Sequence, residues 1–186
     1  MTDLDSLSLN LLTLDDRDRL FRLVDSNREF LRQWLPWVDS NRTADDTQAF
    51  LVQVEAQHRA GKGPQYAIER QGELCGVCGF HTLDARTGTG SIGYWLGERF
   101  GGQGIMTRAV QQLVAEGFET WGMRRIEIAC AVENYKSRAI PERLGFMYEG
   151  VIPEREWLNG RYVDHAMYSL LASESQPDHK VYSHDG

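Results

Sequence analysis

Two clusters of glycines are the first residues of this sequence whose spacing could bind a ligand. Residues 88–93 spell G-x-G-x-x-G, but that dinucleotide fingerprint must follow a strand and open a helix, and here it leads into an extended segment. The second cluster, Gly101-Gly102-Gln103-Gly104, stands between a predicted strand and a strongly periodic predicted helix. There, backbone N–H groups and the positive helix end can converge on a pyrophosphate, which glycine lets approach closely. No Lys-Ser/Thr pair follows, so the pattern favours a cofactor that is held rather than cleaved, with a tight turn capping a core helix as the alternative.

The three cysteines could suggest a metal or redox site, but their positions argue against one. Cys75 and Cys78 form a C-x-x-C within a predicted strand, where a spacing of three sends side chains to opposite faces. Together with Cys130 they cannot make a full disulfide framework, so a reducing compartment fits them better. We therefore predict no metal in the site.

Taken in order along the chain, several motifs resemble those of one enzyme family. Arg99-Phe100-Gly101-Gly102-Gln103-Gly104 is similar to the R/Q-x-x-G-x-G/A acyl-CoA pyrophosphate motif of GNAT acetyltransferases. Further segments resemble the RimJ/RimL branch, which acetylates protein N-termini including those of ribosomal proteins; they are residues 93–96, 103–107, 134–137, 144–146 and 156–160. The resemblance covers nearly the whole chain. It implies an α/β (α+β) fold with a mixed, mostly antiparallel sheet of about seven strands, splayed at its middle, with helices on both faces and CoA in the splay.

The resemblance also implies roles for individual residues. Acetyl-CoA would be the co-substrate. Backbone groups of Leu96 would contact its pantetheine, Asn134 would hydrogen-bond the pantetheine arm, and Ser137 would lie near the thioester sulfur. The pyrophosphate would lie against Gly101, Gly102, Gln103, Gly104, Ile105, Met106 and Thr107. Pro141 departs from the family pattern, because it removes a donor from the helix that follows Asn134 and predicts a kink there.

The mechanism that the resemblance implies is direct transfer to an amine. Glu156, directly or through water, would take a proton from the ammonium, and a strand N–H near Trp95 or Leu96 would stabilise the oxyanion. Ser137 would then hydrogen-bond the departing thiolate. Plain structural roles remain as alternatives, a solvated strand position for Glu156 and a helix-start hydroxyl for Ser137.

A predicted hairpin carries two rival bases. Asn159-Gly160 is the strongest two-residue turn signal, and it pairs Leu158 with Arg161, Trp157 with Tyr162, Glu156 with Val163 and Arg155 with Asp164. In that register Glu154 and His165 face each other, so either could replace Glu156 as the base.

Trp34 and Trp37 flank Pro36, which argues against an unbroken helix there. These two rings could line the acceptor site, or they could fill space in the hydrophobic core. The acceptor itself is predicted to be a protein N-terminal α-amine, because at pH 7 roughly a tenth of such amines are free base, against a few ten-thousandths of lysines. A polyamine or drug acceptor, another donor such as succinyl-CoA, and a non-catalytic acyl-CoA-binding module are the alternatives.

The elements that must position these residues follow from periodicity and capping signals. Thr43 predicts a helix start, and the segment after Gly104 predicts the most regular helix, with two adjacent apolar stripes. The predicted strands are residues 7–12, 65–69, 73–82, 91–96 and 125–132 and the two arms of the hairpin. Asn134 to Leu144 predicts a helix that Gly145 ends.

Composition sets the remaining expectations. With 186 residues, 41% hydrophobic and 25% charged, the chain fits one domain, predicted as residues 1–172 with a polar tail at 173–186. The net charge of -7 argues against a nucleic-acid partner. No apolar run reaches the roughly 18 residues of a membrane span, and Met1-Thr2-Asp3-Leu4-Asp5 lacks a basic signal-peptide start, so a cytoplasmic location is expected. A homo-oligomer is compatible with the sequence.

Overall fold

The computed structural model describes residues 7–175, and all structural statements refer to them. The start of the chain and most of the predicted tail lie outside the described residues. Seven strands form one sheet in the order β1-β2-β3-β4-β5-β7-β6, and only β4 and β5 pair in parallel. The strands are β1 (Leu7–Leu11), β2 (Gln65–Arg70), β3 (Glu73–Asp84), β4 (Thr89–Leu96), β5 (Arg125–Ala131), β6 (Met147–Leu158) and β7 (Arg161–Leu171). The predicted mixed, mostly antiparallel seven-stranded sheet is confirmed.

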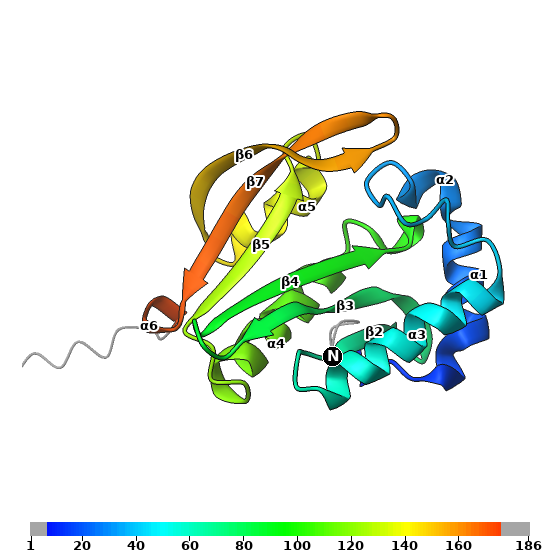
Figure 1. Ribbon diagram of the computed structural model, residues 1–186, viewed down its shortest axis with the longest axis horizontal. Helices are drawn as coiled ribbons and strands as arrows, with labels where there is room; N and C mark the ends of the chain where they lie inside the picture. The colour runs from blue at the N-terminus through cyan, green and yellow to red at the C-terminus, as the bar shows by residue number, and fades with distance from the viewer. Residues whose placement is uncertain (1–6, 176–186) are drawn as a thin grey trace, which may run out of the picture.

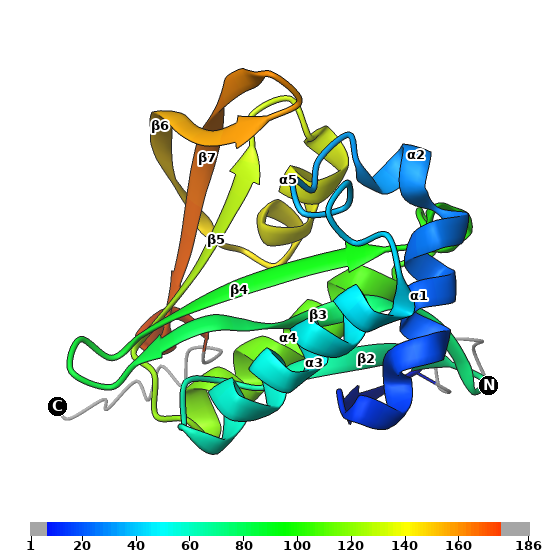
Figure 2. The ribbon, with the colours of Figure 1, turned by 45° about the vertical axis from the view of Figure 1, so that its right-hand side comes forward.

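Helices cover both faces of the sheet, as predicted (Figures 1 and 2). They are α1 (Arg17–Ser26), α2 (Arg28–Leu31), α3 (Ala44–Arg59), α4 (Ile105–Glu119), α5 (Tyr135–Arg143) and α6 (Ala172–Ser175), with single 3₁₀ turns at Leu14–Asp16 and Glu98–Phe100. On one face α1 and α3 pack over Ala67, Leu74 and Val77 of the sheet. On the other face α4 and α5 cover the larger core, which includes Phe80, Ile126 and Tyr168. None of the described helices is long and apolar enough to cross a membrane.

The sheet is splayed where β4 meets β5. Their parallel pairing runs only from Thr89 with Arg125 to Ile92 with Ile128, although both strands continue beyond these residues. Figure 1 shows the two strands diverging past this point. Backbone groups of β4 that face the gap therefore lack a strand partner and can bind a ligand. The predicted splay is confirmed.

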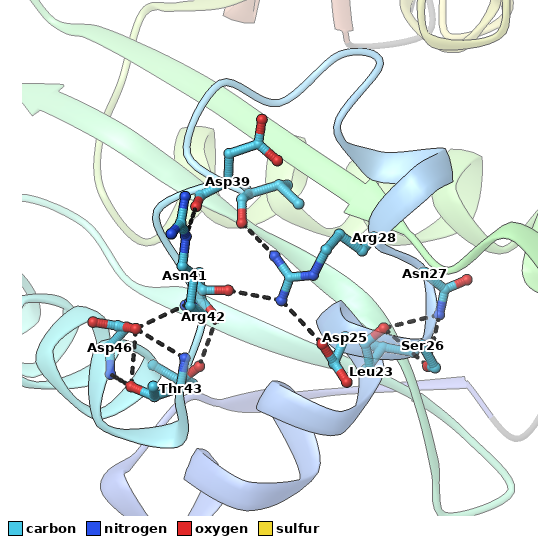
Figure 3. A network of polar contacts seen from close by, with 12 residues as sticks. Leu23, Asp25, Ser26, Asn27, Arg28, Asp39, Asn41, Arg42, Thr43 and Asp46 are labelled. Carbon is cyan, nitrogen blue, oxygen red and sulfur yellow. Dashed lines mark hydrogen bonds and ion pairs between the residues drawn. The ribbon is translucent and has the colours of Figure 1, made fainter.

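The two predicted apolar stripes of helix α4 face the larger core. The residues that the sequence placed on these stripes are buried as far as Gly117, and Phe118 and Trp121 are half-buried against this core. A Cβ on Gly117 would lie 2.8 Å from Ile126 Cδ1, so glycine lets this helix approach β5 closely. Thr43 caps α3 as predicted, accepting a hydrogen bond from the Asp46 N–H at 3.3 Å. Hydrogen bonds from Thr43 and from the Arg42 N–H in turn lower the pKa of the Asp46 carboxyl (Figure 3).

The prediction that Cys75 and Cys78 face opposite sides of the sheet is wrong. Ile68 pairs with Gly76 and Glu69 with Leu74, so Cys75 is an extra residue in a bulge that interrupts the alternation. Both thiols consequently lie in the core cluster beneath α4, and neither is in a disulfide.

The C-terminal hairpin confirms the predicted register only near its turn. The pairs of Leu158 with Arg161, Trp157 with Tyr162 and Glu156 with Val163 are present. The predicted pair of Arg155 with Asp164 is absent from the ladder, because residues 153–155 form a bulge and His165 pairs with Ile152. Glu154 therefore does not face His165, and its backbone N–H instead donates to Asp164 Oδ1 at 2.8 Å.

Candidate active site

A cleft of 1120 Å³ lies on the α3 side of the sheet, at the splay. Its walls come from α3, from the segment between α2 and α3, from β3 to β5, and from the β6–β7 hairpin. Its lining includes the following residues that the sequence singled out for the site: Trp34, Trp37, Trp95, Asn134, Ser137, Glu156 and His165. Leu96 and residues 101–107 are not among its lining residues, so the glycine loop lies outside this cleft.

The loop between β4 and α4 has the backbone shape that anion binding requires. Gly102 and Gly104 have φ of 74° and 75°, a conformation that side chains other than glycine rarely adopt. Among the described residues no side chain caps α4, and its first turn holds no acidic residue. The Gln103 side chain is tied down, donating to the Arg99 carbonyl at 2.7 Å and accepting from Arg70. The first N–H groups of α4 and its positive end are thus presented to a ligand, and this cradle fits a pyrophosphate.

Leu96 presents its backbone to the splay. The Gly97 N–H donates to the Cys75 carbonyl at 2.9 Å, and Trp95 pairs with Val77 in the same register. Since hydrogen-bonding direction alternates along an antiparallel strand, the N–H and C=O of Leu96 face away from β3, toward β5. Of the two strand N–H groups considered from the sequence, Leu96 is the one that faces the gap.

A cluster of neutral polar groups surrounds Ser137 in the cleft. Ser137 Oγ lies 3.2 Å from Cys130 Sγ, and Asn134 Oδ1 accepts from the Ser137 N–H at 3.1 Å. Tyr94 donates its hydroxyl proton to the Ser137 carbonyl at 3.0 Å. Burial raises the pKa of the Tyr94 hydroxyl and that of the Cys130 thiol, so both stay protonated at neutral pH. Because its Oδ1 accepts from the Ser137 N–H, the Asn134 side chain caps helix α5 and is also a candidate to bind the pantetheine. The sequence analysis did not predict this capping role.

Pro141 explains the bond from Tyr94. Helix α5 continues through this proline. The missing proline N–H would have bonded the carbonyl four residues earlier, which is that of Ser137. The Tyr94 hydroxyl takes this free acceptor and ties α5 to β4 across the splay.

Two histidines, His81 and His165, line the cleft together with Glu156. His165 Nε2 lies 3.3 Å from Glu156 Oε2, with the side chains 13% and 31% exposed. His81 faces the cleft from β3, where desolvation lowers its pKa against the opposing effect of the Glu156 charge, so its ring is neutral at pH 7. Sequence reasoning missed His81, although a glycine within a strand was a signal. A Cβ on Gly93 would lie 1.8 Å from His81 Nε2, so only glycine lets the imidazole lie over β4.

An aromatic wall closes the cleft on the side of the segment between α2 and α3. The Trp37 and Trp95 rings lie 5.9 Å apart, tilted by 55°. Arg28 holds this segment by donating to the carbonyls of Val38 and Asn41 at 2.6 and 2.8 Å (Figure 3). The Asn159 amide donates to the Arg32 carbonyl at 2.9 Å, so the hairpin turn touches the same segment.

Comparison with known proteins decides the family. A family model described as "Acetyltransferase (GNAT) domain" matches residues 6–147. The chain belongs to the GNAT acetyltransferases. This GNAT chain is 32% identical over 167 residues to the ribosomal-protein-serine acetyltransferase of Escherichia coli, covering 90% of this chain and 93% of that protein.

Solved structures agree with the assignment. RimL, a ribosomal L7/L12 alpha-N-protein acetyltransferase in complex with coenzyme A, matches with a TM-score of 0.87 and 32% identity, over 92% of this chain and 96% of that one. The microcin C7 self-immunity acetyltransferase MccE, in complex with acetyl-CoA and AMP, matches with a TM-score of 0.85 and 32% identity, over 90% and 93%. The protein is thus a GNAT N-acetyltransferase with acetyl-CoA as its co-substrate.

Proposed function

We propose that this GNAT enzyme acetylates the N-terminal α-amine of a protein, of the ribosomal-protein type, by direct transfer in a ternary complex. The observation that carries the proposal is that the carboxylate of Glu156 and the hydroxyl of Ser137 line one cleft at the splay of the sheet. The names of its relatives support a protein acceptor, since two of them modify ribosomal proteins. Such an acceptor places the reaction in the cytoplasm.

Acetyl-CoA would bind across the splay from the α4 side. The pyrophosphate would lie on the N–H groups of residues 101–107, the Leu96 backbone would bond the pantetheine, and the side-chain amide of Asn134 would donate to it. The fit rests on the left-handed glycines, the uncapped helix and the direction of the Leu96 backbone groups. When bound, acetyl-CoA supplies the thioester whose acetyl group is transferred.

The residues of the chain would then move the protons. Glu156 takes a proton from the acceptor ammonium, and the Leu96 N–H stabilises negative charge that develops on the carbonyl oxygen. The Ser137 hydroxyl donates to the departing sulfur, while Cys130 and Tyr94, kept protonated by burial, hold Ser137 in place. Trp34 and Trp37 would form the wall along which the acceptor chain enters.

Carboxylates around the cleft favour a cationic acceptor, since Asp46, Glu127 and Glu156 all line it. A polyamine carries this charge too, so the test must separate the two acceptor classes. The purified enzyme is incubated with either acetyl-CoA or succinyl-CoA and with either a mixture of intact proteins or a panel of polyamines, and products are identified by mass spectrometry. The proposal expects proteins that gain one acetyl group at the N-terminal residue. Transfer to polyamines alone, or only from succinyl-CoA, would overturn it.

A further inference from the structure

His165 is a buried imidazole whose hydrogen-bonding capacity is unmet. Among the described residues neither ring nitrogen has a hydrogen-bond partner, although both nitrogens are buried. Leaving a buried polar atom unpaired destabilises the fold, so such an atom needs an explanation. The carboxylate of Glu156, whose Oε2 lies 3.3 Å from Nε2, is within reach but not aligned as a hydrogen bond.

The bulge in β6 moves Glu154 away from the position opposite the ring, which leaves Glu156 as the neighbouring glutamate. Between the pairs of Ile152 with His165 and Glu156 with Val163, three residues of β6 face Asp164 alone. Without the two extra residues, Glu154 would face the imidazole. The bulge is held by a left-handed backbone at Glu154, with φ of 51°, and by its N–H bond to Asp164. Because bulges re-aim side chains beside active sites, this one selects which glutamate meets His165.

Both residues of the pair line the cleft, and they differ in exposure. His165 lies between Ala131 of β5 and Ile152 of β6, so its ring has neighbouring strands on both sides. Glu156 is more exposed than His165, 31% against 13%, and both line the cleft. The carboxylate is therefore the group that an acceptor meets, and the imidazole lies behind it.

We propose that His165 is a positioning residue for acetyl transfer, whose ring donates its Nε2–H to Glu156 Oε2 and leaves Oε1 aimed at the acceptor amine. The inference rests on the proposed function, in which Glu156 is the base. An N–H bond of the ammonium breaks, and an O–H bond forms at Oε1. Catalytic hydrogen bonds are often long before the acceptor binds and shorten in the complex, which accounts for the 3.3 Å contact. A carboxylate held at one oxygen loses less orientational freedom when the amine arrives.

A double-mutant cycle on the full chain tests this role. Two variants separate the donor from the ring: His165→Gln keeps an N–H donor of similar reach, and His165→Leu keeps apolar bulk without a donor. Each is made alone and with Glu156→Gln, and kcat, acceptor KM and the acetyl-CoA Kd are measured with an α-amino peptide at pH 7. His58→Leu is the matched control, because His58 also has a buried unpaired Nδ1 but packs against Trp121 outside the cleft.

The expected result is a loss of kcat of about 10- to 100-fold in His165→Leu, the range for a hydrogen bond to a charged group, with the acetyl-CoA Kd unchanged. His165→Gln stays within about threefold of the wild type, and His165→Leu adds less than about twofold when Glu156→Gln is already present. His58→Leu keeps the wild-type kcat.

Three results would overturn the positioning role: an unchanged kcat in His165→Leu, equal losses in His165→Gln and His165→Leu, or additive losses in the cycle. Failure of the proposed function is seen separately, as a wild-type enzyme that acetylates another amine and not the peptide. The cycle is then run on that amine, and the same three results decide the role of His165.

Discussion

Ser137 shows how one residue is placed by several weak contacts rather than one strong one. Its N–H bonds Asn134, its carbonyl accepts from Tyr94, and its hydroxyl touches Cys130. The first of these is a helix cap and the second depends on Pro141, so two of the three contacts would be present whether or not the hydroxyl took part in chemistry. In the proposed reaction the hydroxyl contributes a single hydrogen bond, to the departing sulfur of the thioester. A thiol with a pKa near 8.5 already leaves readily as thiolate.

Replacing Ser137 by alanine should therefore lower turnover by about tenfold or less, the loss expected for one hydrogen bond, with little change in the acetyl-CoA Kd. Steady-state kinetics with an α-amino peptide measures this. Ser169→Ala is the control, because Ser169 bonds Glu149 away from the cleft and should keep full turnover. A loss beyond about a thousandfold would mean that Ser137 transfers a proton essential to the reaction.

At the scale of elements, the glycine loop and helix α4 form one unit whose two ends can be compared. Gly104 at the N-terminal end has φ of 75°, and Gly122 just beyond the C-terminal end has φ of 65°. A side chain at either position strains the backbone, by roughly 1–2 kcal/mol. Only the N-terminal end presents free N–H groups and a positive dipole to an anion.

Gly104→Val should abolish acetyl-CoA binding while the protein remains folded, because the branched side chain occupies the phosphate cradle. Gly122→Val, the matched control, should lose a similar amount of stability and keep its affinity for acetyl-CoA. Calorimetric titration together with thermal unfolding separates the two effects. Wild-type affinity in folded Gly104→Val would remove the loop from the cofactor site.

Local signals predicted most of these elements, and long-range pairing produced the departures. The N-cap at Thr43 and the turn at Asn159-Gly160 depend on residues a few positions apart, and the structure confirms both. The bulges at Cys75 and at residues 153–155 depend on how a strand meets its partner, which no short window contains. For that reason the sequence assigned Glu154 to His165, whereas the structure brings Glu156 to it.

At the scale of the whole molecule, the fold buries titratable groups in its larger core. Cys78 is fully buried, and desolvation raises the pKa of its thiol from the ordinary value of 9.0. The unfolded chain binds fewer protons than the folded chain above that value, so this thiol's contribution to stability is complete below pH 9 and is lost as the pH rises. Below pH 9 the thiol has no effect on how the free energy of unfolding changes with pH.

The free energy of unfolding should accordingly fall by about 1 kcal/mol more in the wild type than in Cys78→Ala between pH 9 and pH 10. Urea unfolding under reducing conditions at each pH provides the measurement. The comparison concerns the slope with pH, so a constant loss of stability from the smaller alanine does not affect it. Identical slopes for the two proteins would contradict the burial of an uncharged thiol.

The proposal that the enzyme acetylates protein N-termini rests on the basicity of the acceptor. In this proposal Glu156 is the base among the carboxylates that line the cleft, and at pH 7 an α-amine with a pKa near 8 needs far less help to lose its proton than a lysine near 10.4. The most direct measurement compares initial rates at pH 7 for two peptides of one sequence, one with a free N-terminus and one that is N-blocked with a free lysine. The account predicts a rate at least about tenfold higher for the free N-terminus. It also predicts that the rate of Glu156→Gln depends more strongly on high pH than the rate of the wild type does. Equal rates on the two peptides, or an unchanged pH profile in Glu156→Gln, would contradict it.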